Sequence, residues 1–414
     1  MPSHWAAIQL RRTFDIVNGG TPPVSNEDCW DGDTAWLTPD DLGRNNRKFI
    51  GQGQRNITSE GIRTSSARLS PAHSVLLSTR APIGHLAITE VPAASNQGCR
   101  TLVPLGPAQS EFAYYALLAS RDVLQAAGKG STFMELSASD LAAHRLPSPP
   151  VDEQRSINAY LDRETARIDS LILMQELLVE RLDEHRMALV TRVVTKGLPP
   201  VAAGAAGLDT APTLKDSGVD WLGKVPANWK VLHLRHVCRF AYGDSLRLED
   251  REQGEIPVYG SNGRVGFHSE ANTSAPVIIV GRKGSHGKVN YEFGTAFAID
   301  TTYFVDESCT TSDLRWLYYA LLSADLADVS KDAAVPGLSR EDAYAKYLPL
   351  PPLAEQRAIG EYLDVMSERI DALRAKAELS IERLSEYRSA VIAAAVTGKI
   401  DVREAELAGA GGGA

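Results

Sequence analysis

The strongest constraint on this sequence is a long stretch that occurs twice. Residues 146–195 and 348–397 align without a gap at a constant offset of 202 positions, and 25 of the 50 aligned residues are identical. This identity indicates a duplication, and its period is far longer than the roughly 20–45 residues of a solenoid repeat. The chain is therefore expected to consist of two tandem units, each with a divergent globular part followed by a well-matched part.

The duplicated stretches have the pattern of long helices. Pro149-Pro150 and Pro351-Pro352 precede them, and the first copy contains no further Gly or Pro before Gly197. Apolar residues recur at spacings of three, four or seven, which predicts a narrow coiled-coil seam. The expected packing positions are Leu161, Ile168, Leu171, Leu178 and Leu182 in the first copy and Leu363, Ile370, Leu373 and Leu384 in the second.

Each such helix would be about 65 Å long and would have too little neighbouring protein to cover its apolar stripe. We therefore expect the two copies to bury each other's stripe in an antiparallel intramolecular coiled coil. Because each helix follows its own globular part, that pairing would place the globular parts at opposite ends. The alternative is that each helix packs separately on its own domain.

The globular parts show a mixed pattern of strands and helices. SVLLSTR and LAITEV in the first unit, and PVIIVGR, KVNYEF and FAIDTTYFV in the second, are typical of strands, whereas EFAYYALLASRDVLQAA and DLRWLYYALLSADLADV have helical periodicity. The predicted fold is α+β or mixed, with two α/β domains in tandem, each followed by a long helix. The expected boundaries are 1–145 and 215–347 for the domains, 146–198 and 348–402 for the helices, 199–214 for a flexible linker and 403–414 for a disordered tail.

Composition restricts the function classes. The 414 residues carry a net charge of -9, which counts against a simple electrostatic nucleic-acid binder. The sequence has no run of 18 apolar residues, so we expect no membrane span. It has no apolar region near Met1, so we expect no secretory signal. Four widely spaced cysteines favour neither a zinc site nor a disulfide scaffold. We expect a cytoplasmic protein without membrane association.

Catalytic motifs are largely missing. GRKGSHGK at Gly281–Lys288 has five residues between Gly281 and Gly287, and Val289 follows Lys288, so it does not match a phosphate-binding loop. The prolines that could mark an adenine methylase loop lack a preceding Asn or Asp, and Pro39-Asp40-Asp41 lacks the further residues of a nuclease motif. We therefore expect a protein with no catalytic residues and no metal site of its own.

This layout resembles the specificity subunit of type I restriction–modification systems. The most specific element is Leu-Pro-x-Pro-Pro-x-x-Glu-Gln-Arg-x-Ile, which occurs at Leu146–Ile157 and again at Leu348–Ile359 and continues into Tyr-Leu-Asp and Arg-Ile-Asp both times. The stretches ASNQG, IPVYGSNGRVG, GRKGSHGKVN and DSGVDWLGKVPANW also look like family elements. The resemblance covers nearly the whole chain, from Trp5 to about Val402.

The resemblance implies a non-catalytic subunit that binds double-stranded DNA. Each target-recognition domain would read one half of a split, asymmetric site, and the antiparallel helices would fix the spacer and dock methylase subunits. S-adenosylmethionine, ATP and Mg would belong to partner subunits only, with a restriction subunit as an optional further partner. A coiled-coil adaptor without DNA specificity and a stand-alone methylase or nuclease remain the alternatives.

Basic and amide side chains in the globular parts are the candidates for DNA contact, because Arg pairs with guanine and Asn with adenine. They are Arg44, Asn46 and Arg80 in the first unit and Asn262, Arg264, Arg282, Lys283, His286 and Lys288 in the second. Arg80 and Arg282 match at the repeat offset, which favours phosphate contact or a role in folding over sequence reading at that position. Glu153, Gln154 and Arg155, with their repeats, are expected to tie each helix start to its adjacent domain.

Overall fold

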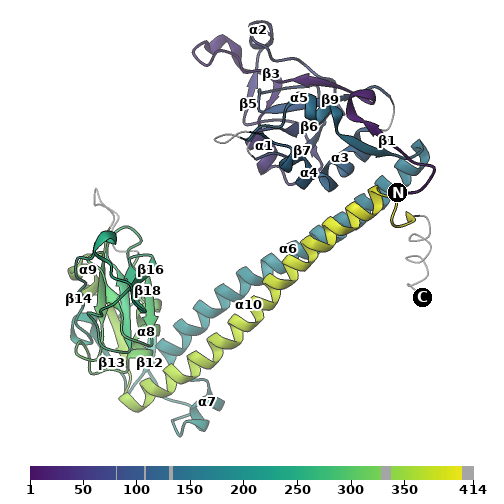
Figure 1. Cartoon of the computed structure of the whole chain (residues 1–414). Helices are drawn as coiled ribbons and strands as arrows, with labels where there is room; N and C mark the ends of the chain where they lie inside the picture. Colours follow the sequence, from purple (N-terminus) through teal and green to yellow (C-terminus); the bar gives the residue numbers. More distant parts are fainter. Residues whose placement is uncertain (81, 107–108, 130–133, 328–336, 403–414) are drawn as a thin grey trace, which may run out of the picture. The chain divides into compact units, whose positions relative to one another are not determined.

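The computed structural model describes residues 1–80, 82–106, 109–129, 134–327 and 337–402, which form two compact units (Figure 1). Unit 1 combines Met1–Gln175 with the chain from Leu379 onward, and unit 2 comprises Glu176–Glu378. Each unit therefore contains one globular domain together with part of both long helices. The sequence-based boundaries instead separate the helices from the globular parts.

Unit 1 contains a five-stranded sheet of order β2-β9-β6-β7-β4, a three-stranded sheet of order β5-β3-β8 and the antiparallel pair β1-β10. Its strands are β1 Ala6–Gln9, β2 Phe14–Asn18, β3 Trp30–Leu37, β4 Phe49–Ile50, β5 Arg55–Ile57, β6 Val75–Ser78, β7 Leu86–Thr89, β8 Ala93–Ser95, β9 Cys99–Pro104 and β10 Arg145–Ser148. Its helices are η1 Leu10–Arg12, η2 Glu27–Cys29, α1 Pro39–Arg44, α2 Ser59–Arg63, α3 Gln109–Ala119, α4 Arg121–Ala126, α5 Ala138–Ala143 and the first part of α6 Val151–Lys196.

Unit 2 contains a four-stranded sheet of order β14-β20-β17-β18, a three-stranded sheet of order β16-β15-β19 and the pairs β13-β21 and β11-β12. Its strands are β11 Leu214–Asp216, β12 Lys224–Pro226, β13 Lys230–His233, β14 Ala241–Tyr242, β15 Ile256–Gly260, β16 Gly263–His268, β17 Val277–Gly281, β18 Val289–Glu292, β19 Phe297–Ala298, β20 Thr302–Val305 and β21 Tyr347–Leu350. Its helices are α7 Pro200–Ala205, η3 Leu234–His236, η4 Leu248–Asp250, α8 Leu314–Ser323, α9 Arg340–Ala345 and the first part of α10 Leu353–Val396.

The strand orders show that the duplication includes the globular domains. The pair β1-β10 corresponds to β13-β21, and the ladder β2-β9-β6-β7 corresponds to β14-β20-β17-β18. In the smaller sheets, β3 is antiparallel to β5 and parallel to β8, just as β15 is antiparallel to β16 and parallel to β19. The predicted mixed fold with two tandem domains is confirmed. Strand β4 pairs in parallel with β7 at the edge of its sheet, and among the described strands of unit 2 it has no counterpart.

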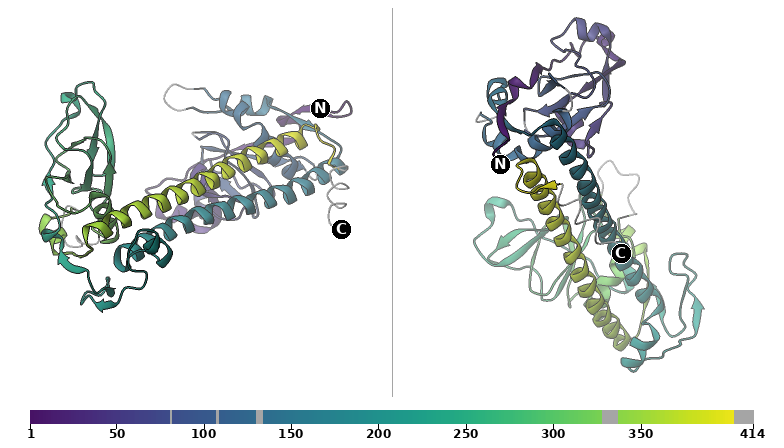
Figure 2. Two further views of the ribbon diagram at one scale, coloured as in Figure 1. Left: turned by 90° about the horizontal axis from the view of Figure 1, so that it is seen from below. Right: turned by 90° about the vertical axis from the view of Figure 1, so that its right-hand side faces the viewer.

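Within each unit, the segments of the long helices α6 and α10 run antiparallel to one another (Figures 1 and 2). In unit 1, Arg388 Nε lies 2.7 Å from Asp169 Oδ1. In unit 2, Arg374 pairs with Asp183 at 3.7 Å, and Arg186, three residues further along α6, pairs with Asp371, three residues back along α10. The predicted antiparallel pairing is thus confirmed within each unit. At the repeat offset, the Asp169–Arg388 pair corresponds to the Asp371–Arg186 pair, so the duplication produced both.

The predicted seam is wrong at three positions. Leu171, Leu178 and Leu373 are 39%, 44% and 52% exposed, whereas Leu161, Ile168, Leu363 and Ile370 are buried and Leu182 and Leu384 are half-buried. The less exposed residues of α6 recur at alternating spacings of four and three, which is the pattern of a regular heptad seam. Its positions are Leu161, Thr165, Ile168, Ile172, Gln175, Val179, Leu182, Arg186 and Leu189. Leu171 and Leu178 lie one residue outside this seam, on the solvent side.

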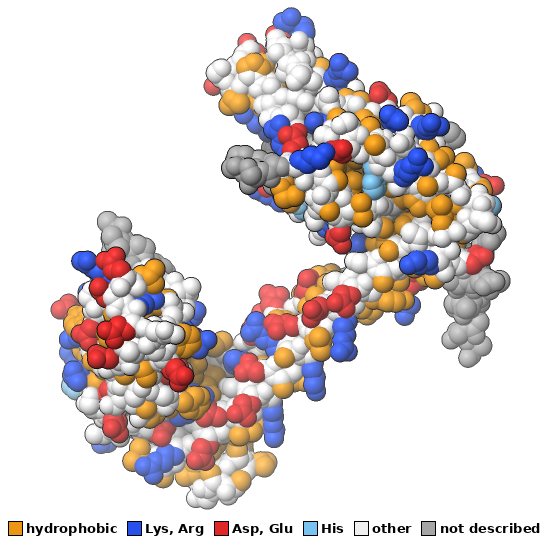
Figure 3. Space-filling model, viewed as in Figure 1, with side chains coloured by type: hydrophobic (Ala, Val, Ile, Leu, Met, Phe, Trp, Pro, Cys, Tyr) orange, Lys and Arg blue, Asp and Glu red, His pale blue; other side chains and the backbone are white. Residues whose placement is uncertain are grey.

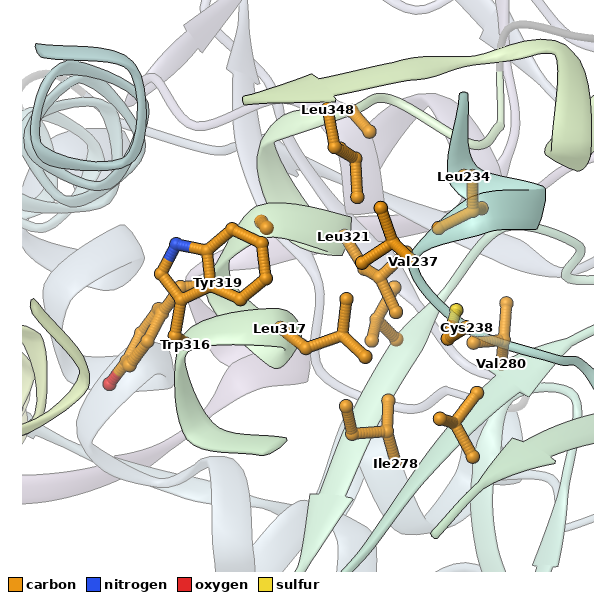
Figure 4. Close-up of a cluster of buried hydrophobic side chains, with 14 of the residues drawn as sticks. Leu234, Val237, Cys238, Ile278, Val280, Trp316, Leu317, Tyr319, Leu321 and Leu348 are labelled. Carbon is orange, nitrogen blue, oxygen red and sulfur yellow. The ribbon is translucent and has the colours of Figure 1, made fainter. Parts of the chain in front are cut away.

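Each domain has its own hydrophobic core, and each core includes helix residues. In unit 2, Val193 of α6 and Leu363 of α10 belong to the same cluster as Trp316 and Leu317 of α8. Figure 4 shows part of this cluster, with Trp316 and Leu317 of α8 beside Ile278 of the sheet. In unit 1, Leu161 of α6 and Val391 of α10 cluster with α3. The ends of the helix pair are therefore anchored by domain cores as well as by each other.

Two other expectations need comment. The expected linker 199–214 contains a helical turn, α7, and its last residue begins β11, because Pro200 favours the first helical position. The expected tail 403–414 lies outside the described residues. Cys29, Cys99, Cys238 and Cys309 are all buried and unpaired.

Within the described ranges, no helix is both long enough and apolar enough to cross a membrane.

Candidate nucleic-acid interface

The motif GRKGSHGK forms the tight connection between β17 and β18. Gly284 and Gly287 adopt positive φ angles of 72° and 77°, which favour glycine. A Cβ at Gly281 would lie 2.6 Å from the carbonyl oxygen of Ser261, in the turn between β15 and β16. The absence of a side chain at Gly281 thus lets two loops approach, and these loops carry the candidate residues of unit 2.

Three of the candidates in these loops are held by internal hydrogen bonds. Lys288 Nζ donates to the backbone oxygen of Asn262 at 2.8 Å and approaches its Oδ1 at 3.2 Å. Both ring nitrogens of His286 face carbonyl oxygens, those of Gly284 and Ala327. Arg264 is exposed on β16 and stacks on Phe267, with 5.2 Å from the guanidinium carbon to the ring centroid. The structure therefore brings Asn262 and Lys288 together and leaves Arg264 exposed on β16, in contact with Phe267.

Arg282 and Lys283 border a cavity of about 460 Å³. Arg282 stacks on Tyr242 at 4.9 Å, and Arg340 of α9 stacks on the same ring at 4.1 Å. Arg340 and Tyr242 are residues that sequence reasoning missed. The signal that could have indicated Arg340 is its place directly after Ser339, a residue type that favours the N-cap position and caps α9 in the structure.

The candidates of unit 1 are less concentrated. Arg44 is exposed in the last turn of α1 and forms an ion pair with Asp40 at 2.8 Å, while Asn46 is exposed just beyond α1. Arg55 pairs with Asp31 and stacks on Trp30. The acidic partners reduce the net positive charge of this region, so it is a weaker anion-binding surface than its basic residues suggest.

Arg80 carries a carboxylate partner. Its Nε lies 3.1 Å from Glu135 Oε2, and Arg100 lies 3.7 Å from the other oxygen of Glu135. The backbone pattern also corrects the expected match between Arg80 and Arg282. The amides of Thr79 and Arg80 share one carbonyl oxygen, and those of Arg282 and Lys283 share the corresponding one. Arg80 therefore corresponds to Lys283, and Thr79 to Arg282.

In the duplicated Glu-Gln-Arg motif, the Glu ties each helix start to its own domain, as expected, whereas Arg155 pairs with Asp152 on its own helix at 3.4 Å. Trp5 Nε1 donates to Glu153 at 2.8 Å, and Trp229 Nε1 donates to Glu355 at 2.9 Å. The next residue acts alike in both units, because Gln154 and Gln356 each donate to the carbonyl of the first proline of the preceding pair.

A second tie uses the aspartate of the duplicated Tyr-Leu-Asp motif, which we call the aspartate joint. In unit 1, Asp162 accepts hydrogen bonds from Tyr115 at 2.5 Å and from Lys48 at 2.7 Å. Lys48 also contacts Glu111 at 2.6 Å, and its side chain is only 13% exposed. Burial and the bond to Asp162 raise the pKa of Tyr115, which keeps the phenol protonated as a donor. Lys48 is thus an internal contact and not an exposed cation.

Unit 2 builds the same joint with a different cation. Asp364 accepts from Tyr319 at 2.7 Å and from Arg315 Nε at 2.5 Å. The Arg315 guanidinium also stacks on Tyr291 at 4.3 Å and on Phe293 at 5.2 Å. The tyrosine and aspartate are inherited from the duplication, whereas the cation precedes β4 in unit 1 and lies on α8 in unit 2. Both units therefore keep this chemistry although its parts differ.

We predict that Asp364→Asn loosens the domain of unit 2 from α10. The substitution leaves Arg315 without its carboxylate, and because both side chains are partly exposed the expected loss in free energy of unfolding is about 1–2 kcal/mol. Hydrogen exchange of α8 amides would measure it. The matched control is Glu361→Gln, an exposed charge on the same helix, which should leave α8 exchange unchanged. Unchanged exchange in Asp364→Asn would contradict the role of the joint.

The electrostatics of the two helices are mixed. Figure 3 shows acidic and basic side chains interspersed along them, with apolar side chains between. Among the described residues, no group of three His, Cys, Asp or Glu side chains could hold a metal ion. Among the described residues that line the cavity of unit 2, three side chains are cationic (Arg282, Lys283 and Arg340) and one is a carboxylate (Glu341).

Comparisons with known proteins place these features in context. A family model described as the type I restriction modification DNA specificity domain matches residues 2–175 and 226–383. The chain is 29% identical over 273 residues to the type I restriction enzyme MjaIX specificity subunit of Methanocaldococcus jannaschii, covering 64% of this chain and 57% of that protein. It is 23% identical over 369 residues to the EcoprrI specificity subunit of Escherichia coli, covering 86% of both.

The fold also resembles a solved structure. A chain from a structure of the type I R-M system superposes with a TM-score of 0.71 at 15% identity, covering 96% of this chain and 98% of that one. At this level of identity, the likeness shows the fold alone. The match to the M. jannaschii protein spans less than two thirds of that protein's length.

Proposed function

The chain belongs to the family defined by the type I restriction modification DNA specificity domain, and we propose that it selects the DNA site of such a system. The domains of units 1 and 2 each read one half of a split, asymmetric sequence. The observation that carries this proposal is that the family model matches both repeats, in residues 2–175 and 226–383. Two unlike binding surfaces on one duplicated framework suit a site whose two halves differ.

The helices suit the role of a spacer ruler. A helix pair with a heptad seam is stiff along its length, and each end is anchored in a domain core. The indole–carboxylate bonds and the tyrosine–aspartate bonds of the aspartate joint tie each domain to its helix through corresponding residues in both units. Half-sites about one DNA turn apart are separated by roughly 34 Å, which is shorter than either helix.

The remaining parts of the proposal concern partners. We propose that the chain has no catalytic activity itself and docks methylase subunits along the helices in the cytoplasm. S-adenosylmethionine, ATP and Mg would be bound by partner subunits, and a restriction subunit would supply cleavage. The exposed leucines Leu171, Leu178 and Leu373 support docking there, because a helix pair leaves them uncovered.

The test is co-expression of the chain with the methylase encoded beside it, followed by mapping of methylated adenines on genomic DNA. We expect one split motif that disappears when this chain is omitted. A stable complex that imposes no motif would favour the adaptor alternative and contradict the proposal. Methylation by the purified chain alone would contradict its non-catalytic role.

A further inference from the structure

We propose that the cavity of unit 2 bordered by Arg282, Lys283, Arg340 and Tyr242 binds one phosphate of the DNA backbone, and that unit 1 fills the corresponding place with its own Glu135. This inference rests on the proposed function, because it names the chemistry by which one domain holds its half-site. It adds residues and a ligand class that the family match does not supply.

Arg282 and Arg340, the two arginines of the cavity, are positioned by internal contacts in an arrangement that suits anion binding. Both guanidinium groups stack on the exposed ring of Tyr242, at 4.9 and 4.1 Å from its centroid, and both lie within 6 Å of the buried ring of Tyr303. Arg282 Nη1 also donates to the carbonyl of Asp300 at 3.3 Å. Stacking and this bond restrict the side chains before a ligand arrives, which lowers the entropic cost of binding.

The charges around the cavity are unbalanced. Among the described residues that line it, three are cations and one, Glu341, is a carboxylate. Within the described part of the chain, neither Arg282 nor Arg340 forms an ion pair, and the buried Nε of Arg340 has no hydrogen-bond partner. Close cations without counterions repel each other, so a full negative charge stabilises the arrangement. A base edge carries only partial charges, and we therefore favour a phosphate over a base.

Unit 1 shows where an anion sits in this framework. The antiparallel bridge Arg80–Glu135 corresponds to the bridge Lys283–Gly337. Arg100 occupies the β9 position that Tyr303 occupies on β20, since each pairs with the corresponding residue of the next strand. The carboxylate of Glu135 lies between Arg80 and Arg100, at 3.1 and 3.7 Å. Where unit 1 has this internal anion, unit 2 has Gly337, which provides none.

The first test measures binding of the full-length chain to a mixed-sequence 24-base-pair duplex by fluorescence anisotropy at several salt concentrations. We expect Arg282→Gln and Arg340→Gln each to weaken binding roughly tenfold. Each should also reduce the slope of log affinity against log salt by about 0.9, the value for one phosphate. Tyr242→Phe keeps the stacking ring and should bind as wild type, whereas Tyr242→Leu should weaken binding. The charge-matched control is Arg192→Gln, an exposed arginine of α6 in the same unit.

Unit 1 offers the opposite test. Glu135→Gln frees Arg80 and Arg100, so we expect it to strengthen duplex binding several-fold. Glu60→Gln removes an equal charge from an exposed pair with Arg63 and should have little effect. If Glu135→Gln behaves like Glu60→Gln, the correspondence between the two units is wrong.

Four outcomes would overturn the inference. Arginine variants that keep the wild-type salt slope but relax one position of the methylated motif would indicate base reading. Inorganic phosphate could stabilise the chain saturably, and more than chloride does at equal ionic strength. If Arg340→Gln loses this stabilisation but still binds the duplex, the ligand is a free anion. Variants that equal wild type in every assay would refute the site while leaving the proposed function intact. A wild-type complex that imposes no motif would refute the proposed function as well.

Discussion

Trp229→Ala is expected to lower the free energy of unfolding of unit 2 by about 3–5 kcal/mol. The side chain is fully buried in the cluster that contains Val193 of α6 and Leu363 of α10. Its removal would leave a cavity and also deprive Glu355 of the indole donor at 2.9 Å. Urea unfolding followed by hydrogen exchange of unit 2 amides would measure the loss. A loss below about 1 kcal/mol would contradict this placement of Trp229 in the core.

The duplication supplies matched controls for this experiment. Trp5→Ala makes the same change in unit 1, where the indole is 8% exposed, so its effect should be confined to unit 1 and be somewhat smaller. Glu355→Gln keeps an acceptor oxygen for the indole. Burial raises the pKa of Glu355, which means that its charged form is the disfavoured one, and the substitution should change the free energy by less than about 1 kcal/mol.

Local patterns in the sequence predicted most elements of the fold. The uninterrupted repeat indicated α6 and α10 because helical propensity and heptad spacing are local properties. SVLLSTR and PVIIVGR indicated β6 and β17 for the same reason. The antiparallel pairing followed from the need to cover an apolar stripe, and Asp169–Arg388 with Asp371–Arg186 confirms it.

The exact seam could not be predicted from apolar spacing alone. Leu171 lies next to the true seam position Ile172, and Leu178 lies next to Val179. Because both residues of each neighbouring pair are apolar, apolar spacing alone does not show which one lies in the seam. Polar residues such as Gln175 and Arg186 occupy other seam positions. The long stem of Arg186 can pack on the seam while its guanidinium reaches Asp371. Which of two adjacent residues lies in the seam depends on contacts between the two helices, and the sequence pattern of one helix does not contain this information.

The candidate site was predicted in part. Arg282 and Lys283 stood out as basic residues in a glycine-rich turn, but Tyr242 and Arg340 come from β14 and α9, far away in the sequence. The match of Arg80 to Arg282 failed because loops of the two domains differ in length, which shifts the repeat offset by one at this hairpin. The roles of Lys48 and Arg315 in the aspartate joint were likewise hidden, since different elements supply them.

Removal of one heptad from each helix is expected to change which DNA sites are modified. Deleting residues 172–178 from α6 and 378–384 from α10 removes opposed stretches of the antiparallel pair. Seven residues are two helical turns in a seam of period 3.5, so the seam phase and the pairs Asp169–Arg388 and Asp371–Arg186 are kept. Under the proposed function, the helices shorten by about 10 Å, which corresponds to a spacer about three base pairs shorter.

Methylation mapping of the co-expressed complex would measure this change. We expect both half-site sequences to stay the same while only the spacer shortens, because neither domain is altered. Deleting residues 172–178 alone puts the two helices out of register, so Asp169–Arg388 and Asp371–Arg186 cannot both form, and modification should be lost. If the doubly shortened chain methylates at the original spacing, helix length does not set the spacer, and the ruler role of α6 and α10 is wrong.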